Sequence, residues 1–579
     1  ESVFDDLGKW LHHHPEQHIS INLEADNLTS ETLPGLLSRK VNHYQINPSQ
    51  IALELTERAF ADPEGFGVGL SEYIALGDWR LFFYGRDKTK DVTAQQADSA
   101  ADKYFVRDNR VVGLFIPDDN PQRAEITKAP SAEELLANYK PQGAAQKIEA
   151  FDSSFDNLDK RTQRIDIGDL NIALLPKQTR GETVTVCMKF KSGDEKNLFG
   201  KSSLQPVAAA MLTRGTKTMT RSEIEDRMTE LKMAGSITNF TTTRKNLPAA
   251  LELVFDAMHN SIMPQDEFDQ FKKQMQVMIE SMRDKPDALA QNAITQHFNT
   301  YPKGDPRHEY SLDESLEQLN RLTVDQVRAF YKEFGGTSRG EISIVGDFDP
   351  KAVEKIIRDD YAKYVSKAHY APIVTEYRPV QATRVVIDTP DKENATIVAR
   401  SVFPINDTSP DAPALTVANW ILGGGTGLSN RLIERLRQKE GLSYGAGSHV
   451  RIPAKGDNGS FVFRAIVAPQ NMLQAEASAR DVIAKAIKDG FTDQEVEEAK
   501  KGLLQAMQVA RSQDDVVARS WNDKMENQRT WVFSKKQAEA ISKLTTADVN
   551  AALRKYIKPD EITFVLAGDQ KKAAQKKQD

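Results

Sequence analysis

Apolar residues recur along this chain at two spacings, and the spacing changes from stretch to stretch. Apolar positions three and four apart predict amphipathic helices at residues 222–235, 247–262, 266–285, 471–490 and 493–512. Short alternating or continuous apolar runs predict strands at residues 18–28, 50–60, 164–178, 182–194, 382–390 and 395–405. We expect residues 164–178 to pair with 182–194 as a hairpin, and 382–390 to pair with 395–405 in the same way.

One pattern of a helix followed by a strand occurs three times, starting at Val92, Leu322 and Leu544. In each copy a threonine after the first apolar residue can cap the helix, an aromatic residue lies near the helix end, and a short apolar run follows. The copies predict domain ends near residues 120, 365 and 579. Two complete domains of about 200 residues would therefore follow a truncated one.

A glycine-rich stretch, Gly423–Gly445, joins a predicted helix to a predicted strand. The helical period places Leu428, Leu432 and Leu436 on one face, and Gly441 is a typical helix-ending residue. The alternation that follows places Leu442, Tyr444, Ala446, Ser448 and Val450 on one face of the strand. Arg437 and Tyr444, both hydrogen-bond donors, would then project on either side of the helix end.

The order G-G-G, then S-x-R-L, then L-R-x-K-x-G-L-x-Y resembles the C-terminal half of the insulinase and pitrilysin type of zinc metallopeptidase. The resemblance implies that Arg437 and Tyr444 touch the substrate backbone near the bond to be cut. It also implies an α+β fold of tandem insulinase-type α/β sandwich domains, each an antiparallel sheet covered by helices. Without the resemblance, the pair would be interpreted as a solvated arginine and a core tyrosine.

The zinc motif of that family is missing from the sequence. Neither H-x-x-E-H nor H-E-x-x-H occurs, and the corresponding helices, residues 200–215 and 411–425, contain no histidine. We therefore expect no catalytic residue and no cofactor in this chain, and the resemblance implies zinc in another half. His297 and His308 are predicted to be hydrogen-bonded surface residues, and Cys187 a buried small hydrophobe.

Two short segments near the start resemble the EAL-type cyclic di-GMP phosphodiesterases, namely I-N-L with Asn22 and E-L-T-E with Glu54. The resemblance implies that Asn22 and Glu54 correspond to two oxygen ligands of Mg²⁺ or Mn²⁺. The opening E-A-L, the downstream D-D-F-G and the later lysine, glutamate and glutamine of that family do not occur. Two oxygen ligands cannot hold a metal pair, so a non-functional remnant is expected.

These patterns divide the chain into five parts. Residues 1–66 are predicted to be the EAL-type fragment and 67–120 the end of an insulinase-type domain; 121–160 would be a linker, 161–370 a domain without the zinc motif, and 371–579 the domain with Arg437 and Tyr444.

Charge and hydropathy narrow the classes of partner. A formal net charge of -7 argues against nucleic-acid binding, and no apolar run is long enough to span a membrane. Any export signal would lie before Glu1, and the resemblance favours a periplasmic location. We expect the chain to hold peptide or unfolded-protein substrates for a zinc-bearing half supplied in cis or in trans. The alternatives are a pseudo-peptidase that acts as a peptide-binding or assembly subunit, or cyclic di-GMP binding or hydrolysis by residues 1–66.

Overall fold

The computed structural model describes residues 19–23, 51–55, 63–104, 136–137, 149–425 and 430–574. The chain falls into two compact units, Glu1–Lys147 and Ile148–Asp579. Within the described residues, no helix combines the length and the apolar character needed to cross a bilayer.

The first unit contains two short strands and three helices in its described part. Strands β1 (Ile19–Leu23) and β2 (Ile51–Leu55) confirm the two strands predicted there, and they pair in parallel. Helices α4 (Pro63–Ala75), α5 (Arg80–Lys90) and α6 (Ala94–Tyr104) follow, and α4 runs across the predicted boundary at residue 66. The strand expected at the end of the first repeat copy lies outside the described residues.

The second unit contains two mixed sheets. The first sheet has the order β3-β4-β8-β5-β7-β6, formed by Gln163–Ile167, Asp169–Pro176, Arg339–Gly346, Thr183–Phe190, Asn239–Thr243 and Ala234–Ser236. The second has the order β11-β12-β10-β13-β9, formed by Ser443–Arg451, Asn458–Val467, Ala395–Pro404, Thr563–Gly568 and Arg384–Asp388. Read from β4 and from β9, both sheets have the same sequence of pairings: one parallel pair followed by three antiparallel pairs.

The two predicted hairpins are wrong. Residues 164–178 form a hairpin by themselves, β3 with β4, and β8 lies between β4 and β5. In the second sheet β13 lies between β9 and β10 in the same manner. In each sheet, a strand from late in the domain's sequence therefore lies between two strands that are neighbours in sequence. Because that strand runs parallel to β4 or β9, each sheet is mixed rather than purely antiparallel.

Helices cover the sheets, and the predicted ones are present. The first domain contributes α8 (Phe155–Arg161), α9 (Leu204–Met211), α10 (Arg221–Glu230), α11 (Leu247–Asn260), α12 (Gln265–Met282), α13 (Pro286–His297), α14 (Leu312–Arg321), α15 (Val324–Phe334) and α16 (Pro350–Asp359). The second contributes α17 (Ala412–Asn419), α18 (Arg431–Ile433), α19 (Met472–Asp489), α20 (Asp493–Ala510), α21 (Asp514–Glu526), α22 (Trp531–Lys543), α23 (Thr546–Tyr556) and α24 (Gln570–Ala574). Thr323 and Thr545 cap α15 and α23 through capping boxes, as the second and third repeat copies predict.

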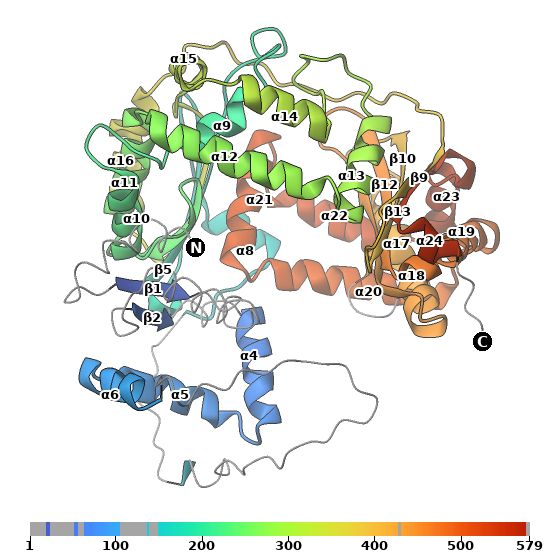
Figure 1. Cartoon of the computed structure of the whole chain (residues 1–579), viewed down its shortest axis with the longest axis horizontal. Coiled ribbons are helices and arrows are strands. Elements are labelled where there is room, and N and C mark those ends of the chain that lie inside the picture. Colours follow the sequence, from blue (N-terminus) through green and yellow to red (C-terminus); the bar gives the residue numbers. More distant parts are fainter. Residues whose placement is uncertain are drawn as a thin grey trace. The chain divides into compact units, whose positions relative to one another are not determined.

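Two helices are exchanged between the domains. Helix α21, from the second domain, packs on β5 and β8 of the first sheet, where Ala518 and Trp521 are fully buried. Helix α13, from the first domain, packs on β10 and β13 of the second sheet, where Ala290 and Ile294 are buried. Most helices of each domain cover one face of its sheet, and a helix of the other domain lies on the opposite face, where α8 joins α21 on the first sheet (Figure 1).

Candidate functional site

Helix α17 and helix α18 both continue into a π-helical turn. Trp420–Gly424 follows α17, and Glu434–Lys439, which contains Arg437, follows α18. The sequence predicts a regular helix here, so the wider turns are a departure from it. Single π-helical turns occur frequently at functional sites. Residues 426–429, including Leu428, lie outside the described residues.

Two leucines fix the Arg437 turn against the second domain. Leu432 and Leu436 are fully buried in the core between the sheet and its helices, as their spacing predicts. Gly441 then ends the turn in the left-handed region, with φ +61°, which glycine adopts without strain. The amide of Leu442 donates to the carbonyl of Leu436 at 2.8 Å and closes the turn. The chain enters β11 directly afterwards.

Tyr444 is the extra residue of a β-bulge. Ser443 pairs with Val467 and Gly445 pairs with Ile466, so Tyr444 has no partner in the ladder. The hydroxyl of Ser443 supports the bulge, because it lies 2.8 Å from the carbonyl oxygens of both Gly445 and Ile466. A bulge commonly re-aims one side chain beside a functional site.

The bulge overturns one prediction about this strand. Strict alternation places Leu442 and Tyr444 on the same face, yet Leu442 is 6% exposed and Tyr444 is 66% exposed. The extra residue changes the alternation at that point, so the two side chains differ in burial. The phenol of Tyr444 is therefore open to solvent at the start of an edge strand.

Arg437 is exposed and has no ion pair or hydrogen bond from its side chain within the described part of the chain. The other cations of the segment are paired: Arg431 with Glu495 at 2.7 Å, Lys439 with Glu434 at 2.8 Å, and Arg435 with Glu440. An arginine left without a carboxylate can donate to carbonyl oxygens of another molecule. The structure thus presents both predicted donors, Arg437 and Tyr444, to solvent from one short segment.

The glycine run allows the turn after Trp420 to lie against β11. A Cβ atom on Gly423 would be 2.7 Å from the backbone nitrogen of Ser448, and one on Gly424 would be 2.3 Å from Nδ2 of Asn419. Ser448 donates its hydroxyl proton to Oδ1 of Asn419 at 2.8 Å, which fixes this approach. A side chain at Gly423 would displace the strand that carries Tyr444, and one at Gly424 would displace the side chain of Asn419.

The described residues do not fit a zinc site. Helices α9 and α17 lie within residues 200–215 and 411–425, which correspond to the zinc-motif helices of the resembling family, and neither contains histidine. Among the described residues, no three His, Cys, Asp or Glu side chains gather as a metal site requires. Asn22 and Glu54, the two EAL-type positions, are register partners on the parallel strands β1 and β2. Their backbones are adjacent, as two ligands of one site would need.

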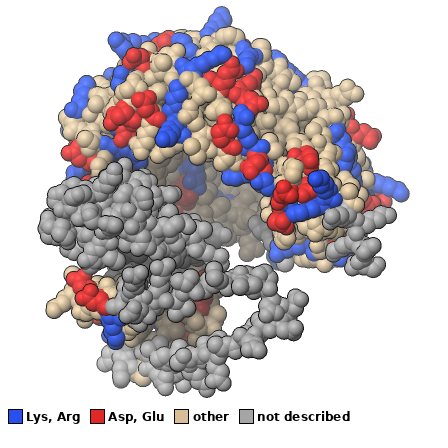
Figure 2. Space-filling view, viewed as in Figure 1, with Lys and Arg blue, Asp and Glu red and all other residues tan. Residues whose placement is uncertain are grey.

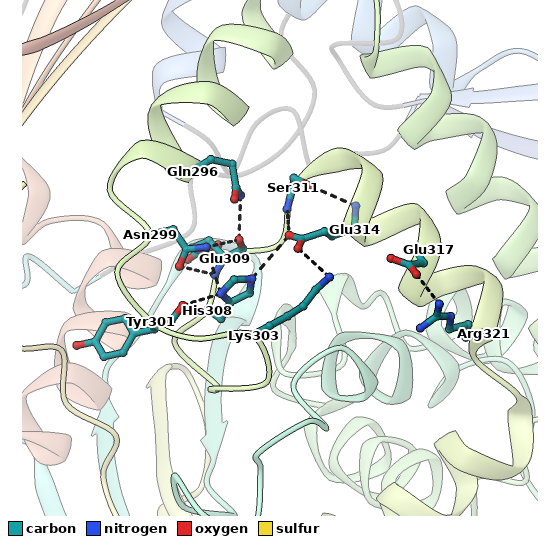
Figure 3. A network of polar contacts seen from close by, with 10 residues as sticks. All are labelled: Gln296, Asn299, Tyr301, Lys303, His308, Glu309, Ser311, Glu314, Glu317 and Arg321. Carbon is teal, nitrogen blue, oxygen red and sulfur yellow. Dashed lines mark hydrogen bonds and ion pairs between the residues drawn. The ribbon is translucent and has the colours of Figure 1, made fainter. Parts of the chain in front are cut away.

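His308 is part of a hydrogen-bonded loop rather than a ligand cluster (Figure 3). Its Nδ1 donates to the carbonyl oxygen of Tyr301 at 2.8 Å, and its Nε2 lies 3.7 Å from Oε2 of Glu314. The backbone amide of Ser311 and the ammonium of Lys303 hold the pKa of Glu314 below its usual value. His297 contacts the carbonyl oxygen of Gln381 at 2.9 Å. The predicted hydrogen bonding of both histidines is confirmed.

Cys187 is buried on β5, as predicted. Burial raises the pKa of its thiol to about 11, so the reactive thiolate is scarce at neutral pH.

One pair of side chains was not anticipated from the sequence. Arg400 and Arg451 lie on the face of the second sheet that α13 partly covers, and neither has an ion pair or hydrogen bond from its side chain in the described part of the chain. A signal was present: Arg400 interrupts the otherwise apolar run ATIVARSVF. Charged residues are rare in buried strands and usually have a partner.

Part of the second unit matches a known protein family. Residues 321–503 match the family model described as the peptidase M16 inactive domain. This region is similar to a peptidase M16 inactive domain. It includes the Arg437–Tyr444 segment, so the predicted resemblance to an insulinase-type C-terminal half is confirmed.

Sequence relatives match both the M16-like part of the chain and its N-terminal segment. An uncharacterized zinc protease of Mycobacterium bovis is 25% identical over 261 residues, which are 45% of this chain and 57% of that protein. A probable cyclic di-GMP phosphodiesterase, PdeB of Escherichia coli K12, is 60% identical over 76 residues, which are 13% of this chain and 15% of that protein. The chain therefore spans little more than half of the first relative and a small part of the second. The predicted EAL-type resemblance of the N-terminal segment is confirmed.

A solved structure shows the same fold. The crystal structure of a peptidase M16 inactive domain from Pseudomonas fluorescens matches with a TM-score of 0.61 at 20% identity, over 70% of this chain and 97% of that one. The predicted α+β architecture of helix-covered sheets is thus confirmed. This part of the chain therefore shares its fold with a peptidase M16 inactive domain.

Proposed function

We propose that residues 148–579 act as the substrate-holding half of an M16-type zinc peptidase. In this proposal Arg437 and Tyr444 donate hydrogen bonds to the backbone carbonyl oxygens of a bound peptide near the bond to be cut. The zinc ion and the attacking water come from another half, in cis or in trans. The periplasm, where related bacterial peptidases are commonly exported, is the proposed location.

The proposal rests on two observations about the donors: Arg437 has no partner among the described residues, and Tyr444 is exposed. Arg437 is unpaired in a segment whose other cations are paired, and Tyr444 projects from a bulge with 66% of its surface exposed. Leaving two donors unsatisfied at the surface gives no stability to the fold. It leaves both free for another molecule, and both lie within the residues matched to the M16 family.

The chemistry of such donors follows from where charge develops. When water attacks a peptide carbonyl, negative charge accumulates on its oxygen, and a preorganised donor aimed at that oxygen lowers the barrier. Loss of one such donor typically lowers the rate about 100- to 1000-fold. Backbone contacts of this kind bind many peptide sequences, because every residue offers the same carbonyl group.

The test compares peptide binding and cleavage. A fluorescent unfolded peptide is titrated with the full chain, and cleavage is then followed after co-expression with a zinc-bearing M16 half. We expect binding without cleavage by the chain alone, and cleavage that a chelator abolishes in the mixture. Arg437→Ala and Tyr444→Phe should each lower the cleavage rate at least about 100-fold.

A matched control lies two residues from Arg437. Lys439→Ala removes an equally exposed cation whose partner is Glu434, and it should leave cleavage unchanged. Chelator-sensitive cleavage by the chain alone would overturn the proposal, as would full activity of both donor variants. A stable stoichiometric complex that shows no cleavage would instead indicate a pseudo-peptidase assembly subunit.

A further inference from the structure

The second sheet has a basic area on the face away from its own domain's helices. Arg400 on β10 pairs in register with Val462 on β12, and Arg451 on β11 pairs with Ser460 on β12. Val462 and Ser460 are two residues apart on one strand and so lie on the same face. Arg400 and Arg451 therefore lie on that face too, in neighbouring rows on either side of β12.

Arg400 is an arginine without a counter-ion. Its Nε atom is buried and has no hydrogen-bond partner, and its guanidinium lies 4.9 Å from the ring centre of Phe298 at the end of α13. Burial lowers the pKa of Arg400, and the nearby charge of Arg451 lowers it further, while Glu309 acts in the opposite direction. A desolvated cation without a bound anion is costly to a fold.

Arg451 borders a pocket of about 290 Å³. The pocket is also lined by the polar residues Thr375, Lys455, Asn458 and Asn527 and by one carboxylate, Glu526. That carboxylate is engaged elsewhere, since Glu526 accepts from Lys189 and lies 3.8 Å from Lys191 and 3.7 Å from Lys455. It is therefore surrounded by cations of its own and does not neutralise the two arginines.

Other charges on this face are balanced. Arg464, on β12, pairs with Asp287 of α13. The outer surface around α12 and α14 also mixes Lys and Arg with Asp and Glu (Figure 2). Arg400 and Arg451 have no ion-pair partner among the described residues, and the formal net charge of the chain is -7. An extended polyanion such as a nucleic acid would need a longer basic track.

We propose that Arg400 and Arg451 form a subsite for a carboxylate of the bound peptide, and hence that the substrates are acidic peptides. This inference rests on the proposed peptide-holding function and names its substrate class. Guanidinium groups bind carboxylates through paired, charge-assisted hydrogen bonds. The subsite is separate from the backbone donors: Arg451 ends β11 and Tyr444 is near its start, about 23 Å away at ~3.3 Å per residue.

The test uses matched fluorescent peptides and the full chain. One extended peptide carries a single internal Glu, its partner carries Gln at the same position, and each is made with a free and with an amidated C-terminus. Affinities come from fluorescence anisotropy. We expect the Glu peptide to bind about tenfold tighter than the Gln peptide, with the difference shrinking at high salt. The amidated pair shows whether an internal or a terminal carboxylate is recognised.

Variants then assign the preference to residues. Arg451→Ala and Arg400→Met should each abolish the preference for Glu while leaving the affinity for the amidated Gln peptide unchanged. Arg451 is exposed, so its variant should fold normally. Arg227→Ala, which removes an exposed arginine of α10 paired with Glu230, is the control and should keep the preference.

The outcomes separate the two proposals. If no peptide binds, the proposed function itself fails. If the amidated Glu and Gln peptides bind equally and the free C-terminus adds nothing, the carboxylate subsite is wrong while the peptide-holding function stands. A preference that survives in both arginine variants would also overturn the subsite, because the carboxylate would then be bound elsewhere.

Discussion

Asn522 on helix α21 donates a hydrogen bond from its side-chain amide to the sulfur of Cys187 on strand β5, 3.1 Å away. Its carbonyl oxygen accepts from the hydroxyl of Ser343 on the neighbouring strand β8. One amide thus ties a helix of the second domain to two strands of the first, at a position that is fully enclosed. Buried polar groups of this kind are costly when they lose their partner.

Asn522→Ala should therefore destabilise the second unit. The change leaves the hydroxyl of Ser343 buried without a partner and opens a small cavity, so we expect the free energy of unfolding to fall by about 2–3 kcal/mol. Urea denaturation measures it. Asn527→Ala, at the half-buried C-terminal cap of α21, is the control. A loss below about 0.5 kcal/mol would show that the interaction contributes little to the packing of α21.

Lys524 provides a prediction about pH. Burial lowers the pKa of its ammonium to about 8, although the cation lies 3.8 Å from the ring centre of Trp531. Between pH 8 and the ordinary value of 10.5 the unfolded chain binds more protons than the folded chain, so this group makes the folded state more stable as pH rises. Lys524→Met removes that dependence.

We therefore expect the stability of the wild type relative to Lys524→Met to increase as pH rises from 8 to 10.5. The measurement is the difference in urea midpoint between the two proteins at each pH, which cancels the contributions of other titrating groups. A difference that stays constant over this range would contradict the lowered pKa.

Gly423→Ala should damage both the site and the fold. The added methyl group would lie 2.7 Å from the backbone nitrogen of Ser448, so β11 must shift. We expect peptide affinity to fall several-fold, with a loss of stability of about 1–3 kcal/mol. Peptide anisotropy and thermal unfolding measure the two effects. Gly445→Ala, where an added Cβ has no heavy atom within 4 Å, is the control.

Arg400→Met should stabilise the protein in the absence of peptide. Methionine fills a similar volume without a desolvated charge, and such replacements often gain roughly 1–3 kcal/mol. Thermal unfolding with and without an acidic peptide measures the effect, and the peptide should stabilise the wild type more than the variant. A lower stability of Arg400→Met without peptide would show that Arg400 serves the fold instead.

The N-terminal segment should not bind cyclic di-GMP. Asn22 and Glu54 are adjacent in register, but two oxygen ligands do not hold a metal pair, and the other expected ligands do not occur in the sequence. Titration calorimetry with Mg²⁺ or Mn²⁺ present should give no heat of binding. Micromolar binding would show that the segment keeps a function.

The sequence was informative where local patterns decide the structure. The spacing of Leu432 and Leu436 correctly predicted their burial, and Thr323 and Thr545 were correctly predicted as helix caps. Strand order was not predictable in this way, because β8 and β13 arrive from far along the chain and insert between strands that are neighbours in sequence. Long-range pairing leaves no mark in local alternation.

The site was predicted only in part, because features that depend on strand pairing do not show in the sequence. Family resemblance drew attention to Arg437 and Tyr444, and both proved exposed. The bulge at Tyr444 was missed, since one extra residue in a strand cannot be seen without its partner strand. Arg400 was passed over because only the folded sheet shows that its Nε atom is buried without a partner.

The exchange of α13 and α21 means that the two domains cannot be taken apart into independent proteins. Severing the chain between residues 371 and 383 would remove a lid from each sheet and expose Trp521 on one fragment and Ile294 on the other. Such fragments would aggregate or recombine rather than persist alone. Each domain therefore depends on the other to complete its own core.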